Sequence, residues 1–237
     1  MRVVDDLAPG SAWEPATPRR FGRGVFLGTV GAGLSSLWWG DSVWGKVSHV
    51  TSPLSSALGL GSGWRIYTVA ATMPVFEPAT WRLKIGGMVE QPQELSYDAL
   101  RSLPQARQTS VFHCVTGWTV NGVHWRGVRF EDLLAAAKPL PGAHALQFVS
   151  AEKPYVDYLS LNQAMLPDVM LAWEMDGKPL LQEHGAPVRV VIPDMYGYKN
   201  VKWVAEINLV RAAGVGYWEQ YGYDNDAWVG RSNGYGA

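Results

Sequence analysis

The segment Ser110–Trp118 reads SVFHCVTGW and holds the single cysteine of this 237-residue chain, Cys114. A lone cysteine cannot form an intrachain disulfide or a metal site built from several cysteines. It can be a small buried hydrophobe, a reactive thiol, or one soft ligand to a metal that other groups mostly hold. Val111–His113 predicts a buried strand and Thr116–Trp118 predicts a turn. We therefore expect the thiol at a strand-to-turn junction that can face a pocket, although cysteines of this kind are often simply buried.

Further motifs follow the cysteine segment in a fixed order. They are HWRGVR at His124–Arg129, LAWEMDGKPL at Leu171–Leu180, and HGAPVRVVIP at His184–Pro193, which leads into YGYKNVKW at Tyr196–Trp203. In order and spacing these blocks resemble the sulfite oxidase family of molybdopterin-dependent oxidoreductases, over most of the chain. Three separate blocks in order are a far stronger signal than one short motif.

The resemblance implies a molybdenum–molybdopterin cofactor and an enzyme that transfers an oxygen atom. In this family the protein supplies one cysteine thiolate to the metal, so the resemblance assigns Cys114 as that ligand, and a soft thiolate suits such a metal. It places Tyr223 near the metal as a second catalytic residue; a surface tyrosine in a loose tail is the alternative. It also assigns a set of cofactor-binding positions: Tyr67, Thr68, Thr72, Ser150, His184, Arg189, Asn200, Val201 and Lys202.

Cations and hydrogen-bond donors in this set suit a cofactor that ends in a phosphate. Other interpretations stay open for three of the positions. Arg189 and Lys202 alternate with apolar residues, so each could lie on the exposed face of a strand. His184 precedes a glycine and could be an ordinary turn residue.

Short predicted elements without regular βαβ alternation indicate an α+β fold with mixed sheets. We expect a linker up to residue 63 and the molybdopterin-binding domain over residues 64–237. The predicted strands are Trp81–Ile85 with a turn at Gly86-Gly87, Val111–His113, Ala145–Val149, Val188–Ile192 and Val201–Leu209. The predicted helices are Ser96–Leu103 with Ser96 as N-cap, Phe130–Ala137 and Leu161–Met165. The chain after Trp203 is too short for the immunoglobulin-like dimerisation domain of sulfite oxidases, so the resemblance is to smaller bacterial members such as periplasmic methionine-sulfoxide reductase catalytic subunits.

The first 63 residues contain an arginine pair, Arg19 and Arg20, before the moderately apolar run Val25–Trp39. This pattern resembles a twin-arginine export signal, although Gly22–Val25 intervenes before Phe26 and Leu27. The run is shorter than the roughly 20 residues that span a bilayer. We expect export to the periplasm or the outer face of the cell membrane, with the segment either cleaved or kept as an anchor. A flexible basic tail is the alternative.

Composition limits the partners. Lys and Arg (20) nearly balance Asp and Glu (21), so no basic excess predicts nucleic-acid binding. No haem, flavin or nicotinamide motif is present, so we expect electrons to come from a separate protein; the resemblance indicates a membrane haem protein.

The residues after the cysteine bear on the substrate. Val115–Thr119 contains no arginine, whereas sulfite oxidases carry positive charge there. An anionic substrate would lack charge-assisted hydrogen bonds worth about 1.5–3 kcal/mol each, and Trp118 makes the site more apolar. This favours reduction of a neutral S-oxide or N-oxide. Sulfite oxidation stays open if an arginine from elsewhere, such as Arg126 or Arg129, reaches the site. A cofactor-free binding or electron-relay module that keeps the fold is a third alternative.

Overall fold

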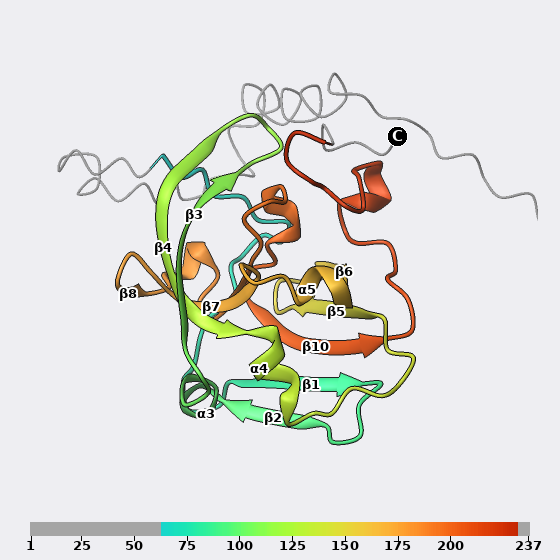
Figure 1. Ribbon diagram of the computed structural model, residues 1–237. Coiled ribbons are helices and arrows are strands. Elements are labelled where there is room, and N and C mark those ends of the chain that lie inside the picture. Colours follow the sequence, from blue (N-terminus) through green and yellow to red (C-terminus); the bar gives the residue numbers. More distant parts are fainter. Residues whose placement is uncertain (1–62, 232–237) are drawn as a thin grey trace, which may run out of the picture.

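The structure is a computed structural model, and it describes residues 63–231. Figure 1 shows a long β-hairpin that stands beside a flatter β-sheet, with short helices at the sheet edges. The strands are β1 (Arg82–Gly87), β2 (Gln93–Ser96), β3 (Ala106–His113), β4 (Thr119–Arg129), β5 (Ala145–Ser150), β6 (Val156–Ser160), β7 (Met170–Met175), β8 (Lys178–Pro179), β9 (Arg189–Val191) and β10 (Val204–Val210). The helices are α3 (Tyr97–Arg101), α4 (Phe130–Ala135) and α5 (Leu161–Ala164), and the 3-10 turns are η2 (Gln182–His184), η3 (Gly197–Lys199) and η4 (Glu219–Tyr221).

The first sheet has the strand order β2-β1-β10-β5-β6. Its β1 and β10 strands run parallel, whereas the other neighbouring pairs are antiparallel. The second sheet has the order β3-β4-β7-β8, and β9 also pairs with β7. One parallel pair among antiparallel ones makes a mixed sheet, and with few short helices this is the α+β fold that the sequence predicts.

The hydrophobic core lies between the sheets and the short helices. Its largest fully buried side chains include Trp173 of β7, Phe148 of β5 and Phe130 of α4. The rings of Phe130 and Phe148 lie 5.5 Å apart between centroids, so α4 is packed directly on the first sheet. Burying large aromatic side chains in this way supplies much of the hydrophobic stabilisation of such a fold.

The predicted elements mostly form, and their ends differ for physical reasons. The Ser96 side chain accepts a hydrogen bond from the Ala99 amide and caps α3, as predicted. The predicted turn at Gly86-Gly87 is wrong, because both glycines continue β1 and pair with β10; a Cβ atom on Gly87 would meet the Leu209 backbone. The strand predicted from Val201 begins only at Val204. Trp203 has a φ of 50°, which is not a strand conformation, and its amide donates to the Gly185 carbonyl.

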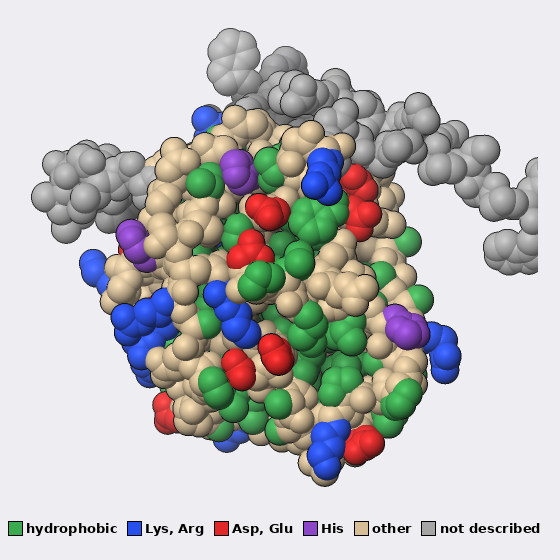
Figure 2. Space-filling view, viewed as in Figure 1, with side chains coloured by type: hydrophobic (Ala, Val, Ile, Leu, Met, Phe, Trp, Pro, Cys, Tyr) green, Lys and Arg blue, Asp and Glu red, His purple; other side chains and the backbone are tan. Residues whose placement is uncertain are grey.

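Charges of both signs are interspersed with apolar side chains on the face drawn in Figure 2, and no block of one sign covers it. Within residues 63–231 no helix is long and apolar enough to cross a membrane. The arginine pair and the apolar run of the predicted export signal lie outside the described residues.

Candidate active site

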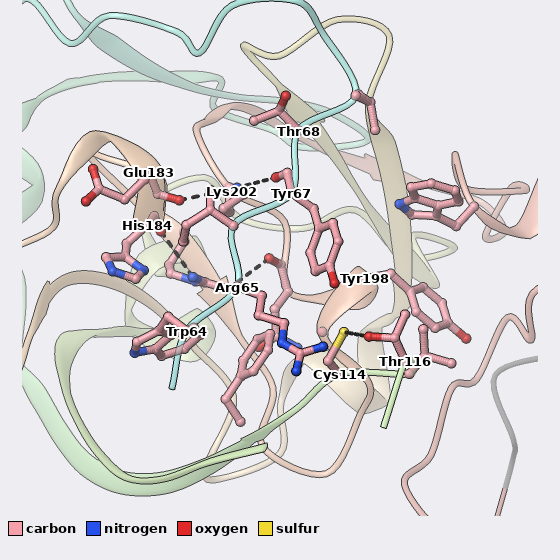
Figure 3. Close-up of a pocket in the computed structure, with 18 of the residues that line it drawn as sticks. Trp64, Arg65, Tyr67, Thr68, Cys114, Thr116, Glu183, His184, Tyr198 and Lys202 are labelled. Carbon is pink, nitrogen blue, oxygen red and sulfur yellow. Dashed lines mark hydrogen bonds between the residues drawn. The ribbon is translucent and has the colours of Figure 1, made fainter. Parts of the chain in front are cut away.

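A cavity of about 280 Å³ opens where the β3–β4 turn faces the segments after β9 and before β1. The turn residues, the 3-10 turns η2 and η3, the segment 64–69 and the stretch 218–223 form its walls (Figure 3). Its lining includes Trp64, Arg65, Tyr67, Thr68, Phe112, Cys114, Thr116, Trp118, Glu152, Tyr155, Glu183, His184, Arg189, Tyr198, Asn200, Lys202, Trp218 and Tyr223. Segments far apart in the sequence therefore meet at one pocket.

Cys114 follows β3 directly, in the five-residue turn that joins β3 to β4. Its amide donates to the Trp118 carbonyl at 2.9 Å, and the Gly117 amide donates to its carbonyl at 3.0 Å. Gly117 has a φ of +92°, which a glycine adopts without strain. The thiol is partly buried, lines the cavity and lies 3.2 Å from the Thr116 hydroxyl. The predicted strand-to-turn position that faces a pocket is confirmed.

Arg189 is a buried cation without a counter-ion. Its side chain is 3% exposed and forms no ion pair with any residue in the described range. The guanidinium donates to the carbonyls of His184 at 3.1 Å and Asn200 at 3.4 Å, while its Nε has no partner in the described part of the chain. Burial lowers the Arg189 pKa to about 10, so the group stays charged at neutral pH. The exposed-strand alternative for Arg189 is wrong.

Lys202 provides a second cation in the same cavity, and it is partly buried. Its ammonium donates to the carbonyls of Tyr67 at 2.7 Å and Glu183 at 3.3 Å. Burial and, to a smaller extent, the charge of Arg189 together lower its pKa to about 7. Two like charges at one pocket, both desolvated, are stabilised by an anion placed between them.

His184 lies at the end of η2 and is 7% exposed. Burial lowers its pKa to about 4, with contributions from the charges of Arg189 and Lys202, so the imidazole is neutral at pH 7. Its ring lies 5.0 Å from the Trp64 ring, between centroids. Gly185 follows with a φ of +103°, and a Cβ atom there would lie 2.9 Å from Lys202 Cβ. Gly185 therefore lets the two cofactor-binding motifs pack together.

Tyr223 is buried, with 8% exposure, and lines the cavity. Its ring packs edge-on against Tyr198 at 5.3 Å and against Trp218 at 5.6 Å. The alternative of a surface tyrosine in a loose tail is wrong. Tyr198 was not predicted; its backbone and hydroxyl are fixed, since Tyr155 donates to its carbonyl and its own hydroxyl donates to the Asp224 carbonyl.

The predicted cofactor-binding residues divide into two groups. Tyr67, Thr68, His184, Asn200 and Lys202 line the cavity together with Arg189. The remaining three, which are Thr72, Ser150 and Val201, do not line it.

Ser150 acts on the cavity indirectly. It is 1% exposed, and its hydroxyl donates to the Lys202 carbonyl at 2.8 Å. It supports the backbone that carries Lys202.

Sequence reasoning missed several lining residues, above all Arg65 and Glu152. Glu152 is 4% exposed, and its Oε1 accepts from the amides of Val69 at 2.7 Å and Ala70 at 3.3 Å. No local pattern reveals this contact, because it joins segments 83 residues apart. The arginines considered from sequence lie elsewhere: neither Arg126 nor Arg129 lines the cavity.

Both of those arginines have other partners. Arg126 pairs with Glu174 at 3.2 Å. Arg129 donates to Gln108 at 2.6 Å.

The cavity fits a polar, anionic organic ligand. The unpartnered, buried nitrogens of Arg189 and Trp118 both belong to lining residues and supply donors. The cations can supply charge, and the thiol that lines the same cavity can supply one soft ligand. No group of three or more His, Cys, Asp or Glu side chains in residues 63–231 is arranged to hold a metal ion.

Comparisons with known proteins agree with this chemistry. The family model described as the oxidoreductase molybdopterin binding domain matches residues 70–218. An uncharacterised oxidoreductase, YuiH of Bacillus subtilis, is 33% identical over 159 residues, which cover 66% of this chain and 80% of YuiH. The sulfite oxidase of Arabidopsis thaliana is 29% identical, covering 61% of this chain and 45% of that protein.

Two further similarities concern sulfur chemistry. The protein-methionine-sulfoxide reductase catalytic subunit MsrP of Campylobacter jejuni is 30% identical, covering 62% of this chain and 54% of MsrP. The crystal structure of the sulfane dehydrogenase SoxCD from Paracoccus pantotrophus superposes with a TM-score of 0.56 at 26% identity, covering 61% of this chain and 41% of that one. The chain thus spans about half the length of these functionally named relatives.

Proposed function

This chain belongs to the oxidoreductase molybdopterin-binding domain family, and from this premise we propose that it catalyses oxygen-atom transfer in the cavity beside Cys114. The family match covers residues 70–218, well over half of the chain. The chain is therefore a molybdopterin-dependent oxidoreductase with a molybdenum–molybdopterin cofactor, as the sequence motifs predict. The family match favours the enzyme over the cofactor-free alternative. The substrate, the direction of oxygen-atom transfer and the roles of individual residues are what we propose below.

The observation that carries the proposal is that one thiol and two cations, the buried Arg189 and the partly buried Lys202, line a single cavity. When bound, molybdopterin and its metal supply the two-electron oxygen-transfer chemistry. Cys114 would give the metal its one protein ligand, as a thiolate. Arg189 and Lys202 would bind the anionic end of the cofactor, which explains how the fold tolerates two desolvated cations without a carboxylate counter-ion.

The tyrosines would act on the substrate side of the cavity. Tyr223 and Tyr198 are held by ring packing and, for Tyr198, by its hydrogen bond to Asp224. A phenol hydroxyl can donate a hydrogen bond to a substrate oxygen and can pass on a proton. Reducing one S-oxide to a sulfide consumes two electrons and two protons and releases one water. We assign Tyr223 to orient the oxygen that leaves the substrate.

Reduction of an S-oxide is the direction that we propose, with an N-oxide as a related substrate class. Support comes from the similarity to MsrP, whose name states sulfoxide reduction, and from the apolar side chains of Val115 and Trp118, which line the cavity in the turn after Cys114. The electrons would come from a separate electron-transfer protein, and we propose a membrane haem protein for this role.

The test is to purify the protein from a host that makes molybdopterin and to measure molybdenum per chain together with sulfoxide reduction by a reduced dye. We expect close to one metal per chain for the wild type and loss of metal and activity in Cys114→Ser. Thr116→Val is the matched control, because it removes the hydroxyl beside the sulfur and keeps the thiol. Full metal content and activity in Cys114→Ser would overturn the assignment of this ligand.

Sulfite oxidation is the second candidate, and Arg65 is the observation that favours it. Its guanidinium supplies to the cavity a positive charge that the turn after Cys114 lacks. The two directions separate in one assay, in which the loaded enzyme is given sulfite with an oxidised dye or a sulfoxide with a reduced dye. Turnover of sulfite alone would replace the first candidate with the second.

We also propose export by a twin-arginine-type route, to the periplasm or the outer face of the cell membrane. The support is the Arg19-Arg20 pair before an apolar run. A protein that binds its cofactor during folding suits a route that carries folded proteins. The Arg19→Lys, Arg20→Lys double variant should stay in the cytoplasm, and unchanged delivery to the cell envelope would contradict this.

A further inference from the structure

The cavity contains one cation that the fold does not engage. Arg189 and Lys202 each donate to two backbone carbonyls. Arg65 lines the same cavity and is exposed, yet it makes no hydrogen bond, ion pair or ring contact with any residue in the range 63–231. A guanidinium offers five N–H donors in a planar fork. In Arg65 these donors remain available to a ligand.

The backbone on both sides of Arg65 is fixed. The Trp64 ring packs against Phe112, 4.8 Å away between centroids, and against His184, 5.0 Å away. On the other side, the carbonyl of Tyr67 accepts from Lys202 at 2.7 Å. The Arg65 side chain therefore starts from an anchored position and extends from it into the pocket.

Its direction brings it to the thiol side of the cavity. Figure 3 shows the Arg65 side chain reaching from the wall formed by Trp64 and Tyr67 toward Cys114 and Thr116. Arg65, Cys114 and Thr116 all line the same cavity. The turn around Cys114 has no basic residue of its own among Val115, Thr116 and Trp118. Arg65 thus supplies from a distant segment the charge that the turn lacks.

We propose that Arg65 recognises a negative charge on the substrate, so that the preferred substrate is a small S-oxide that carries a carboxylate or a similar anionic group near the sulfur. This inference rests on the proposed function and refines its substrate class. The expectation of a neutral substrate depended on the absence of a cation near the thiol, and Arg65 removes that argument. A guanidinium binds a carboxylate through two parallel, charge-assisted hydrogen bonds, which select for charge and for shape.

The first experiment compares two substrates of nearly equal size, methylsulfinylacetate and methylsulfinylacetamide, with the loaded enzyme and a reduced dye. The wild type should favour the anion. In Arg65→Gln the ratio of the two kcat/KM values should fall about ten- to hundred-fold, and Arg65→Lys should recover part of it. Arg107→Gln is the control, because it removes the same charge from an exposed arginine on β3 outside the cavity.

The second experiment measures binding without turnover. Sulfate is titrated into the loaded protein, and its Kd is read from the fluorescence of the cavity tryptophans or by calorimetry. We expect Arg65→Gln to weaken sulfate binding about tenfold or more, with Arg107→Gln like the wild type. Molybdenum per chain is measured in every sample.

The molybdenum content, the sulfate affinity and the substrate ratio each test the role of Arg65. A loss of molybdenum in Arg65→Gln would overturn the proposal, since Arg65 would then hold the cofactor. Equal sulfate affinities, or an unchanged substrate ratio, would also overturn it. If the wild type reduces neither sulfoxide, the proposed direction of the reaction fails, and the sulfate titration still decides the role of Arg65.

Discussion

At the scale of single residues, Lys202 is the group whose ionisation the cavity controls most directly. In the unfolded chain its pKa is the ordinary 10.5, whereas burial and the neighbouring Arg189 lower the pKa to about 7 in the cofactor-free fold. Between these two values the unfolded chain binds more protons than the folded one. Stability therefore rises with pH across this window. A bound anion reverses the effect, because it favours the charged ammonium.

The change to test is Lys202→Met in the cofactor-free protein. We expect the wild-type Tm to rise from pH 7 to pH 9 relative to that of Lys202→Met, because only the wild type loses the cost of holding a desolvated ammonium. In the cofactor-loaded protein the difference between the two curves should no longer rise with pH. Thermal unfolding at several pH values, monitored by circular dichroism, measures both. Parallel Tm curves for the two cofactor-free proteins would contradict the buried-cation interpretation.

The residues of this site differ in how far the sequence could predict them. Cys114, His184, Arg189 and Lys202 lie inside recognisable motifs, and all four line the cavity. Arg65 could not be predicted, because it lies in a segment without regular structure and its neighbours carry no pattern. Its role depends on the cavity that it lines, and that cavity forms only when segments far apart in the sequence fold together.

At the scale of elements, a buried charge cluster joins the parts that carry the cavity tyrosines. Lys199 of η3 contacts Asp157 of β6 at 2.6 Å and Glu219 of η4 at 2.7 Å, and its side chain is 3% exposed. Tyr198 precedes Lys199, and Tyr223 follows η4 closely. The cluster therefore fixes the two elements from which both tyrosines reach the pocket.

Two carboxylates share one ammonium in this cluster, so full ionisation would leave one net negative charge buried. Burial raises the Asp157 pKa to about 7; Lys199 opposes this shift and Glu219 adds to it. Asp157 Oδ2 and Glu219 Oε2 have no hydrogen-bond partner among residues 63–231. Between pH 4 and 7 the unfolded Asp157 is ionised while the folded one holds its proton, so stability falls as pH rises through this range.

We expect Lys199→Met and Asp157→Asn to differ strongly at pH 7. Lys199→Met leaves two buried carboxylates without a cation and should cost about 3–5 kcal/mol of unfolding free energy. Asp157→Asn resembles the protonated acid, so it should cost little and should flatten the fall in stability between pH 4 and 7. Urea unfolding at pH 5 and pH 7 measures both. Equal destabilisation by the two variants would mean that shape rather than charge holds these elements together.

Element boundaries show where local sequence loses its predictive value. Ser96 caps α3 through its own side chain, a local interaction, and the sequence predicts it. The end of β1 depends on parallel pairing of Gly87 with Leu209, more than 120 residues away in the chain, and local pattern suggests a turn there instead. The start of β10 depends on Trp203, whose amide bonds to Gly185 outside the sheet.

At the scale of the whole molecule, residues 63–76 precede the first strand, and residues 64–69 among them form one wall of the cavity. We name this stretch the N-terminal strap. The body of the domain holds it through Glu152, which accepts from two of its amides, through Lys202, and through Gln182, which donates to the Pro74 carbonyl at 3.0 Å. We therefore expect these contacts to slow the release of a cofactor bound in the cavity.

Glu152 is the residue to change, because its buried carboxylate accepts hydrogen bonds from two backbone amides of the strap. Glu152→Ala removes hydrogen bonds to a charged group worth about 1.5–3 kcal/mol each. We therefore expect molybdenum to leave the loaded protein at least about tenfold faster, where 1.4 kcal/mol corresponds to a factor of ten. Dialysis followed by elemental analysis of the retained protein measures this rate.

Glu183→Ala is the matched control for that experiment. Glu183 also lines the cavity, but its side chain makes no hydrogen bond with the described part of the chain, and its carbonyl contact with Lys202 survives the change. Both variants remove one negative charge near the two cations, so a purely electrostatic effect would change both release rates alike. A faster loss in Glu152→Ala alone would assign the effect to the strap. Equal rates would mean that the strap does not limit cofactor release and that binding by Arg189 and Lys202 is sufficient to retain the cofactor.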